Sequence, residues 1–295
     1  MVSLKKIKKV YVVVNPASGQ PSPVLHTINR IFHQHGIRWD MGVTQPGNTA
    51  QLIARAREFE ADVMAVYGGD GTICQLADGM LDDPIPLAIF PGGSANILSA
   101  ELHVPRGLPA ACMLLTKEHQ LRRIDVGRIN ERSFLLRAGI GIEANIVEST
   151  ARELKNDLGP LAYAFSAMKA VLGTKVMEFQ LDMEGKTVKT KGLSCVIANS
   201  GNLGMPNVHF SPTDISDGQL DVFVIRNRNL SSLFAVVTNI VTQVNHEAIQ
   251  HWRVDRIKIR SHPQRTVHYD GEILGEAEVD IHVLPQKIEI VAPIS

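Results

Sequence analysis

Three short apolar runs without polar interruption lie in the first third of the chain, at residues 10–14, 63–67 and 87–90. Such runs are typical of strands buried on both faces of a parallel sheet. Between them, apolar residues recur at helical spacing. These residues are Leu25, Ile28, Ile31 and Phe32, then Leu52, Ile53, Ala56 and Phe59, then Ile73, Leu76, Ala77 and Met80. The alternation predicts an α/β domain with a doubly wound, Rossmann-like sheet.

The pattern changes after about residue 121. Apolar and polar residues alternate at residues 176–183, 256–260, 278–284 and 287–291, which predicts half-buried antiparallel strands. Helical spacing returns only at residues 161–172 and 230–244. We therefore expect an α/β domain over residues 1–124 and a mostly-β sandwich domain over residues 125–295, and we leave open whether the last strand packs back on the first domain.

Composition narrows the class of protein. Lys plus Arg equals Asp plus Glu at 30 each among 295 residues, so no overall field attracts nucleic acid, and we expect no nucleic-acid partner. The three cysteines contain no CxxC pair, which suits a reducing compartment. The apolar run after the basic start "MVSLKKIKK" is too short for a signal peptide or a membrane span. These features predict a cytoplasmic protein.

Glycine-rich segments follow three of the predicted strands, namely "NPASG", "GGDGT" and "PGGSAN". Ligands of open α/β sheets bind outside the carboxyl ends of the strands, so these segments are expected to converge on one site. In "GGDGT", Thr72 is a suitable N-cap for the helix that follows, and free amides at that helix start suit a phosphate. Asp70 beside a phosphate implies a bridging divalent cation. The pattern indicates a metal–nucleotide site, with a plain glycine turn as the alternative.

Other nucleotide signatures are weaker. The chain has no GxxxxGK[ST] segment, so it is not a P-loop protein. "GIGIEA" at residues 139–144 matches the dinucleotide fingerprint GxGxxA after a strand-like run. That fingerprint needs a second parallel strand ending in an acidic residue about twenty residues on, which the sequence here does not offer.

Eight segments occur in the order and approximate spacing of one family and cover nearly the whole chain. They are "NPASG", "GGDGT", "PGGSAN", "GIGIEA", "LGPLAYAFSAMK", "NSGNLG", "SDGQLDVFVI" and "DGE". The chain thereby resembles the diacylglycerol kinase catalytic-domain family, which includes sphingosine kinases and bacterial lipid kinases. "GGDGT" alone is shared with NAD kinases, whereas the later segments resemble the lipid kinases. The resemblance implies ATP-dependent phosphorylation of a lipid hydroxyl at a site between the two domains.

The resemblance also implies roles for particular residues. The nucleotide would be bound by Asn15, Thr44, Gly68, Gly69, Asp70, Gly71, Thr72, Gly93 and Ser94. Asp70 would position the catalytic Mg²⁺, and Glu272 of "DGE" would be the catalytic carboxylate. A second, structural Mg²⁺ would be held by Asp214, Asp217 and the backbone of Gln219. From the residues alone, each "DG" is as readily a turn before a strand.

One departure from the family pattern bears on activity. Many members carry Asn-Glu where this chain has Cys74-Gln75, which removes a carboxylate from the site. We therefore expect an ATP- and Mg²⁺-dependent lipid kinase acting on diacylglycerol or a related lipid. A catalytically weak nucleotide- or lipid-binding regulator and an NAD kinase are the alternatives. Expected partners are ATP and a lipid at a membrane surface, contacted transiently, while a peripheral membrane location and a homodimer are left open.

Overall fold

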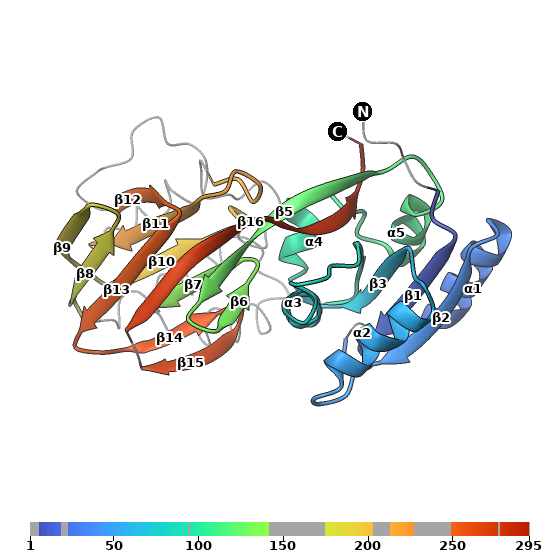
Figure 1. The fold of residues 1–295 in the computed structure, drawn as a ribbon, viewed down its shortest axis with the longest axis horizontal. Helices are drawn as coiled ribbons and strands as arrows, with labels where there is room; N and C mark the ends of the chain where they lie inside the picture. Colours follow the sequence, from blue (N-terminus) through green and yellow to red (C-terminus); the bar gives the residue numbers. More distant parts are fainter. Residues whose placement is uncertain are drawn as a thin grey trace, which may run out of the picture. The chain divides into compact units, whose positions relative to one another are not determined.

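The computed structural model describes residues 6–18, 23–93, 95–141, 175–202, 213–226, 249–276 and 278–294. The chain forms two compact units, which we call the N-terminal unit (residues 1–124 and 286–295) and the C-terminal unit (residues 125–285; Figure 1). The predicted helices at residues 161–172 and 230–244, and the predicted site residue Ser94, lie outside the described residues.

A parallel sheet forms the centre of the N-terminal unit. Its strands run in the order β2-β1-β3-β4, where β1 is Lys9–Val14, β2 Arg38–Val43, β3 Val63–Gly68 and β4 Leu87–Pro91. All three pairings are parallel. Beside β4, Ile290 of β16 (Val279–Ala292) pairs in parallel with Leu87. The three apolar runs thus form β1, β3 and β4, and the predicted α/β architecture is confirmed.

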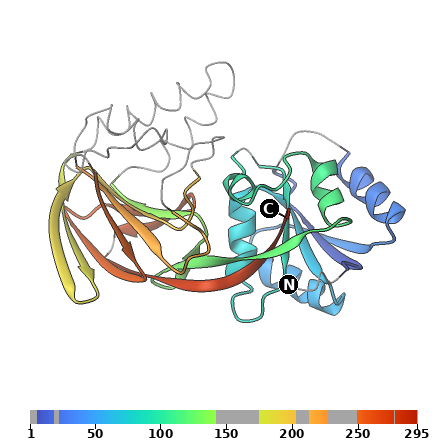
Figure 2. The same cartoon turned by 90° about the horizontal axis from the view of Figure 1, so that it is seen from above.

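Helices cover both faces of this sheet (Figure 2). They are α1 (Val24–Gln34), α2 (Thr49–Glu58), α3 (Asp70–Asp78), α4 (Ile97–Glu101) and α5 (Leu108–Leu114). Residues of α1 and α5 share a core with one face of β1, β3 and β4. The predicted apolar faces are buried except at two positions: Leu25 is 45% exposed, and Phe59 is half-buried at the end of α2. The buried stripe of α1 therefore begins at Ile28, one turn later than the sequence predicted.

The strand β2 is not among the apolar runs that the sequence shows. It lies at the edge of the sheet and pairs only with β1, and Gly42 is its only fully buried residue. A Cβ at Gly42 would lie 2.6 Å from the hydroxyl of Tyr11, so glycine is required by the packing of that face. An edge strand that buries so little carries no periodic signal in the sequence.

The C-terminal unit is an antiparallel sandwich. One sheet has the order β12-β11-β10-β7-β14-β15. Its strands are β7 (Arg137–Ile140), β10 (Ser194–Ala198), β11 (Leu220–Ile225), β12 (Ile249–Val254), β14 (Thr266–Tyr269) and β15 (Glu272–Glu276). The other contains the start of β16 with β13 (Arg256–His262), β8 (Met177–Met183) and β9 (Lys186–Gly192). Their buried side chains form one core, which confirms the predicted sandwich.

One sequence expectation for the strands needs correction. The alternating runs at 278–284 and 287–291 are one strand, β16, in which Gln286 adopts a positive φ of 49°. The chain passes from the N-terminal to the C-terminal unit within β5 (Gln120–Ile129), which pairs with β6 (Arg132–Phe134). None of the described helices has both the length and the apolar character needed to cross a membrane.

Candidate active site

The carboxyl ends of the parallel strands lie at one level and bring the glycine-rich segments together. Val14 of β1 pairs with Val43 of β2 and with Tyr67 of β3, and Gly68 pairs with Pro91 of β4. Because β2 lies on one side of β1 and β3 on the other, the strand order reverses between β1 and β3. Ligands of doubly wound sheets bind at such a switch point. The fold therefore places "NPASG" and "GGDGT" at the expected ligand edge.

A side-chain hydrogen bond joins the two segments at this point. Asn15 Nδ2 donates to the hydroxyl oxygen of Thr72 over 2.8 Å, and Asn15 Oδ1 accepts from the backbone N–H of Ala17 over 3.0 Å. Thr72 is 8% exposed. The backbone N–H of Thr44, after β2, donates to the carbonyl of Val14. Asn15, Thr44 and Thr72 thus lie along one edge of the sheet, and the first and last are in direct contact.

The prediction that Thr72 caps α3 is wrong. The helix begins at Asp70, with Gly69 as its N-cap residue, so Thr72 lies in the first turn. Its side chain is instead turned under the end of β3, where a Cβ at Gly68 would lie 3.0 Å from the Thr72 hydroxyl. The hydroxyl stabilises the loop through Asn15 and leaves the first amides of the helix to other partners.

Asp70 connects "GGDGT" to "PGGSAN". Its two carboxylate oxygens accept hydrogen bonds of 3.0 Å each from the backbone N–H groups of Ile97 and Leu98, in the first turn of α4. Asn96 precedes this turn in the left-handed conformation and exchanges two hydrogen bonds with Gly93. A carboxylate at a helix start is favoured by the free amides there. Asp70 therefore has a structural role in the loop in addition to any catalytic one.

The physical reason for glycine differs between positions in these loops. A Cβ at Gly93 would lie 2.5 Å from the Cα of Gly69, so the two segments touch backbone to backbone. Gly71 is different, because a Cβ there would meet nothing within 4 Å and its φ is not positive. Its backbone N–H donates to no group of the described chain. Packing explains glycine at 69 and 93 but not at 71, where the bare surface suits close approach of a ligand.

In the C-terminal unit, the "DGE" segment forms a hairpin. Asp270 and Gly271 connect β14 to β15 with φ values of 43° and 88°, as a two-residue type I′ turn requires. Glu272 is the first residue of β15 and pairs with Tyr269, whose hydroxyl donates to Glu272 Oε2 over 3.1 Å. The turn predicted from the sequence is confirmed. Glu272 is an exposed carboxylate on a strand, oriented by its cross-strand neighbour.

Asp270 has a role that the sequence analysis missed. Its carboxylate accepts hydrogen bonds from the backbone N–H groups of Leu135, Leu136 and Arg137 at 2.6, 3.0 and 2.9 Å, and its own N–H donates to the carbonyl of Arg137. This carboxylate fixes the hairpin that carries Glu272 to the start of β7. An Asp before Gly reads as a turn residue, so only the folded chain reveals the three amides.

The opposite side of residues 135–137 is held by "NSGNLG". The buried Asn199 donates from Nδ2 to the carbonyls of Leu135 and Asp125 at 2.8 and 3.0 Å. The backbone N–H groups of Asn199 and Ser200 both donate to the carbonyl of Leu136. The family segments "DGE" and "NSGNLG", far apart in sequence, thereby meet at residues 135–137 in one hydrogen-bond network.

The segment predicted to hold a structural Mg²⁺ has other contacts. Asp214 accepts from the N–H of Ser216, and Asp217 accepts from the N–H of Gln219 and forms an ion pair with Arg253. No cluster of three His, Cys, Asp or Glu side chains suited to a metal occurs in the part of the chain that the structure describes. A metal at Asp217 would have to compete with the guanidinium of Arg253 for the carboxylate. A magnesium ion here remains a prediction.

The remaining sequence hypotheses are resolved in part. The strand β7, which contains the first two residues of "GIGIEA", is antiparallel to both its neighbours, so the dinucleotide fingerprint, which follows a parallel strand, does not apply. None of the three cysteines forms a disulfide, and burial raises the pKa of Cys112 and Cys195 to about 12.

Asp70 and Glu272 lie in different units, and their pairing in one site remains a prediction.

Comparison with known proteins agrees with this fold. Residues 9–129 match the diacylglycerol kinase catalytic domain, and residues 137–292 match the YegS C-terminal NAD kinase beta sandwich-like domain. The chain therefore belongs to the family that combines a diacylglycerol kinase catalytic domain with a YegS-type sandwich.

Individual relatives are distant. An uncharacterized protein of Synechocystis is 28% identical over 99% of this chain and 72% of its own length. A provisionally named lipid kinase of Staphylococcus carnosus is 29% identical over 78% of this chain and 76% of its own. The crystal structure of a provisionally named diacylglycerol kinase from Bacillus anthracis superposes with a TM-score of 0.82 at 24% identity over 98% of both chains, which supports the fold alone.

Proposed function

We propose that this protein is an ATP-dependent lipid kinase that phosphorylates a hydroxyl of diacylglycerol or a related lipid. The observation that carries the proposal is the loop after β3, which is locked at the switch point of the sheet by Asn15 and Asp70 while Gly71 leaves bare backbone. Phosphoryl transfer needs mainly positioning and electrostatic stabilisation of phosphates, and backbone amides at a helix start supply both.

The nucleotide would be held at this loop. The N–H of Gly71 and the first turn of α3 would face the phosphates, with Thr44 and Ser94 as further contacts. Mg²⁺ bound with ATP would neutralise phosphate charge. Asp70 is the carboxylate of this loop that could meet such an ion, because it sits at N1 of α3, although two of its interactions are already with amides.

The lipid hydroxyl would be prepared by Glu272. In the proposed step the hydroxyl oxygen attacks the γ-phosphorus, its proton passes to the carboxylate, and ADP leaves. The type I′ turn, the Tyr269 hydroxyl and the amide contacts of Asp270 all restrict where this carboxylate can lie. Such fixed placement is what a positioning base requires.

Two alternatives share the fold. The sandwich match is described as NAD kinase-like, so NAD is a possible acceptor in place of a lipid. Gln75, exposed on α3 where the family pattern implies a Glu, favours a regulator with little activity. One assay separates the three: radiolabelled ATP with a panel of lipids in mixed micelles and with NAD. Product on a lipid supports the proposal, product on NAD alone replaces it, and ATP binding without any product supports the regulator.

A further inference from the structure

A cavity of about 990 Å³, lined mostly by polar and charged residues, opens in the C-terminal unit. It is lined by side chains of β8, β9 and β13, by residues 263–264 and Glu278, and by Arg226 and Gln250 of the other sheet. None of these residues belongs to the loops described above. A volume of this size is at the upper end of the range for small-molecule sites.

Strand register explains why charged side chains gather here. Glu178 of β8 pairs with Lys191 of β9 and with His262 of β13, which makes one row across three strands. Two residues further along, Gln180 pairs with Lys189 and with Arg260. Because side chains two apart on a strand share a face, both rows project to the same side of the sheet.

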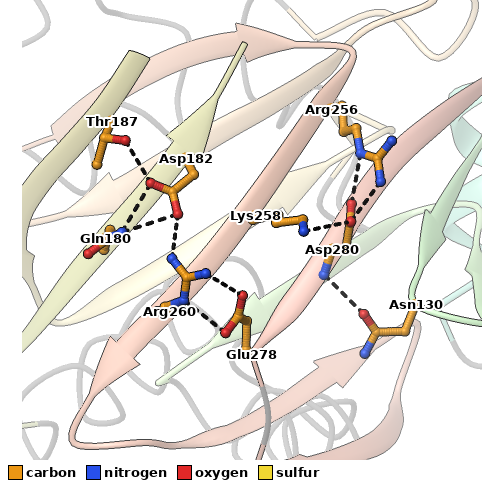
Figure 3. Close-up of polar contacts among 9 residues, drawn as sticks. All are labelled: Asn130, Gln180, Asp182, Thr187, Arg256, Lys258, Arg260, Glu278 and Asp280. Atoms are coloured by element: carbon orange, nitrogen blue, oxygen red, sulfur yellow. Dashed lines mark hydrogen bonds and ion pairs between the residues drawn. The ribbon is translucent and has the colours of Figure 1, made fainter. Parts of the chain in front are cut away.

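The charges in these rows are only partly compensated. Lys191 pairs with Glu178 at 3.1 Å. Figure 3 shows Arg260, which pairs with Glu278 at 2.7 Å and with Asp182 at 2.5 Å. Those ion pairs use both acidic residues of the lining. Lys189 has no anionic partner among the described residues, and its cross-strand neighbour is the neutral Gln180.

Two residues from the other sheet add further donors to the lining. Arg226, directly after β11, likewise has no anionic partner within the described ranges. Gln250 of β12 accepts a 2.6 Å hydrogen bond from Thr190 through its side-chain oxygen, which leaves the amide nitrogen as a donor. The cavity therefore presents two uncompensated cations and an amide donor, while Phe179 and Pro263 are the apolar contributors to its lining.

We propose that this cavity binds a phosphate monoester through Lys189 and Arg226. A guanidinium offers paired donors to phosphate oxygens, and an ammonium group adds a point charge, so together they match a dianion. The volume exceeds that of phosphate alone and accommodates the organic group that carries it. The phosphate could belong to a soluble molecule or to a lipid headgroup, and the two sources differ in how they reach the cavity.

The test is binding to the full-length protein at about physiological salt, where nonspecific charge attraction is screened. Inorganic phosphate and glycerol 3-phosphate are titrated by calorimetry. Vesicles of phosphatidylcholine, with and without phosphatidic acid, are tested by co-sedimentation. The variant is the double substitution Lys189→Gln and Arg226→Gln. The matched control is Lys186→Gln, which removes a charge from the same strand outside the cavity.

We expect the double variant to bind the phosphate-bearing probe at least roughly tenfold more weakly, as loss of charged hydrogen bonds predicts, and the control to bind as the parent does. Binding of glycerol 3-phosphate without vesicle binding identifies a soluble ligand, and the reverse identifies a headgroup; either supports the site. Absence of binding to every probe overturns the proposal. So does equal weakening by Lys186→Gln, which would show diffuse charge attraction.

Discussion

The carboxylate of Asp70 accepts a 3.0 Å hydrogen bond from the backbone N–H of Leu98 and so ties the start of α3 to the start of α4. The side chain that is proposed to bind the metal–nucleotide complex thus also connects two loops. A substitution at this position will change structure as well as chemistry, and the two effects have to be measured separately.

Asp70→Asn is expected to abolish most turnover while the protein still folds. The asparagine keeps one acceptor oxygen for Ile97 or Leu98 and loses the other, which is expected to lower the free energy of unfolding by about 1–3 kcal/mol. Denaturant unfolding and ATP-dependent lipid phosphorylation are measured on the same preparations. Asp82→Asn, an exposed position after α3, is the control for loss of charge. Normal turnover in Asp70→Asn would exclude this carboxylate from the reaction.

Gly71→Ala is expected to separate ligand binding from stability. Alanine is favoured over glycine in a helix by about 0.5–1 kcal/mol, and its Cβ meets nothing here, so the protein should be as stable or slightly more stable. ATP affinity should nevertheless fall, because the methyl group occupies the proposed phosphate approach. Gly93→Ala is the contrast: its Cβ would collide with Gly69, so we expect a loss of about 1–3 kcal/mol. ATP affinity is measured by calorimetry. Normal affinity in Gly71→Ala would show that the nucleotide does not approach this residue.

Glu272→Gln is expected to lower lipid turnover by roughly two to four orders of magnitude with little change in ATP affinity, the usual range for a general acid–base group. The exposed side chain contributes little packing, so the melting temperature should hold. Asp270→Asn is the companion variant. It tolerates the positive φ but weakens the contacts with the amides of residues 135–137, so stability should fall along with turnover. A near-normal rate for Glu272→Gln would show that the residue has only a structural role in the hairpin.

Arg253→Gln is expected to increase any stabilisation by Mg²⁺. The guanidinium contacts Asp217 directly, so a metal and Arg253 compete for the same carboxylate. Freeing Asp217 strengthens metal binding to the folded state and raises the melting temperature in Mg²⁺ relative to chelator. Arg256→Gln, which loses a partner of Asp280 instead, is the control. Identical magnesium responses in parent and Arg253→Gln would show that no metal uses Asp217.

The outer face of β13 and β16 predicts a pH dependence. Two hydrogen bonds from Arg256 lower the pKa of Asp280, with Lys258 and His282 adding to the effect (Figure 3). A carboxyl whose pKa is lower in the folded state stabilises the fold above its unfolded value of 3.8 and loses this contribution as pH falls through the folded value. In urea unfolding from about pH 5 to about pH 2, Asp280→Asn should therefore flatten the fall in stability. A fall in Asp280→Asn parallel to that of the parent would contradict the assignment.

The sequence by itself determined the architecture of both units. A strand buried on both faces, such as β3, has an unbroken apolar run, whereas a strand buried on one face, such as β13, alternates apolar and polar residues. The burial of each strand can therefore be predicted from its residues. The Asp270–Gly271 turn could also be predicted from the sequence, because few residue pairs tolerate two positive φ values in succession. The edge strand β2 could not be predicted, since it buries almost nothing.

Only the tertiary structure decided which polar groups meet. Thr72 suits a cap in sequence, yet in the fold it lies within the first turn of α3 and bonds to Asn15, 57 positions away. Asp270 meets amides more than 130 positions away, and Asp217 meets Arg253, 36 positions away. Hydrogen bonds and ion pairs act over about 3 Å, and contacts of that range between distant segments are set by strand order and register. Local sequence patterns carry no record of them.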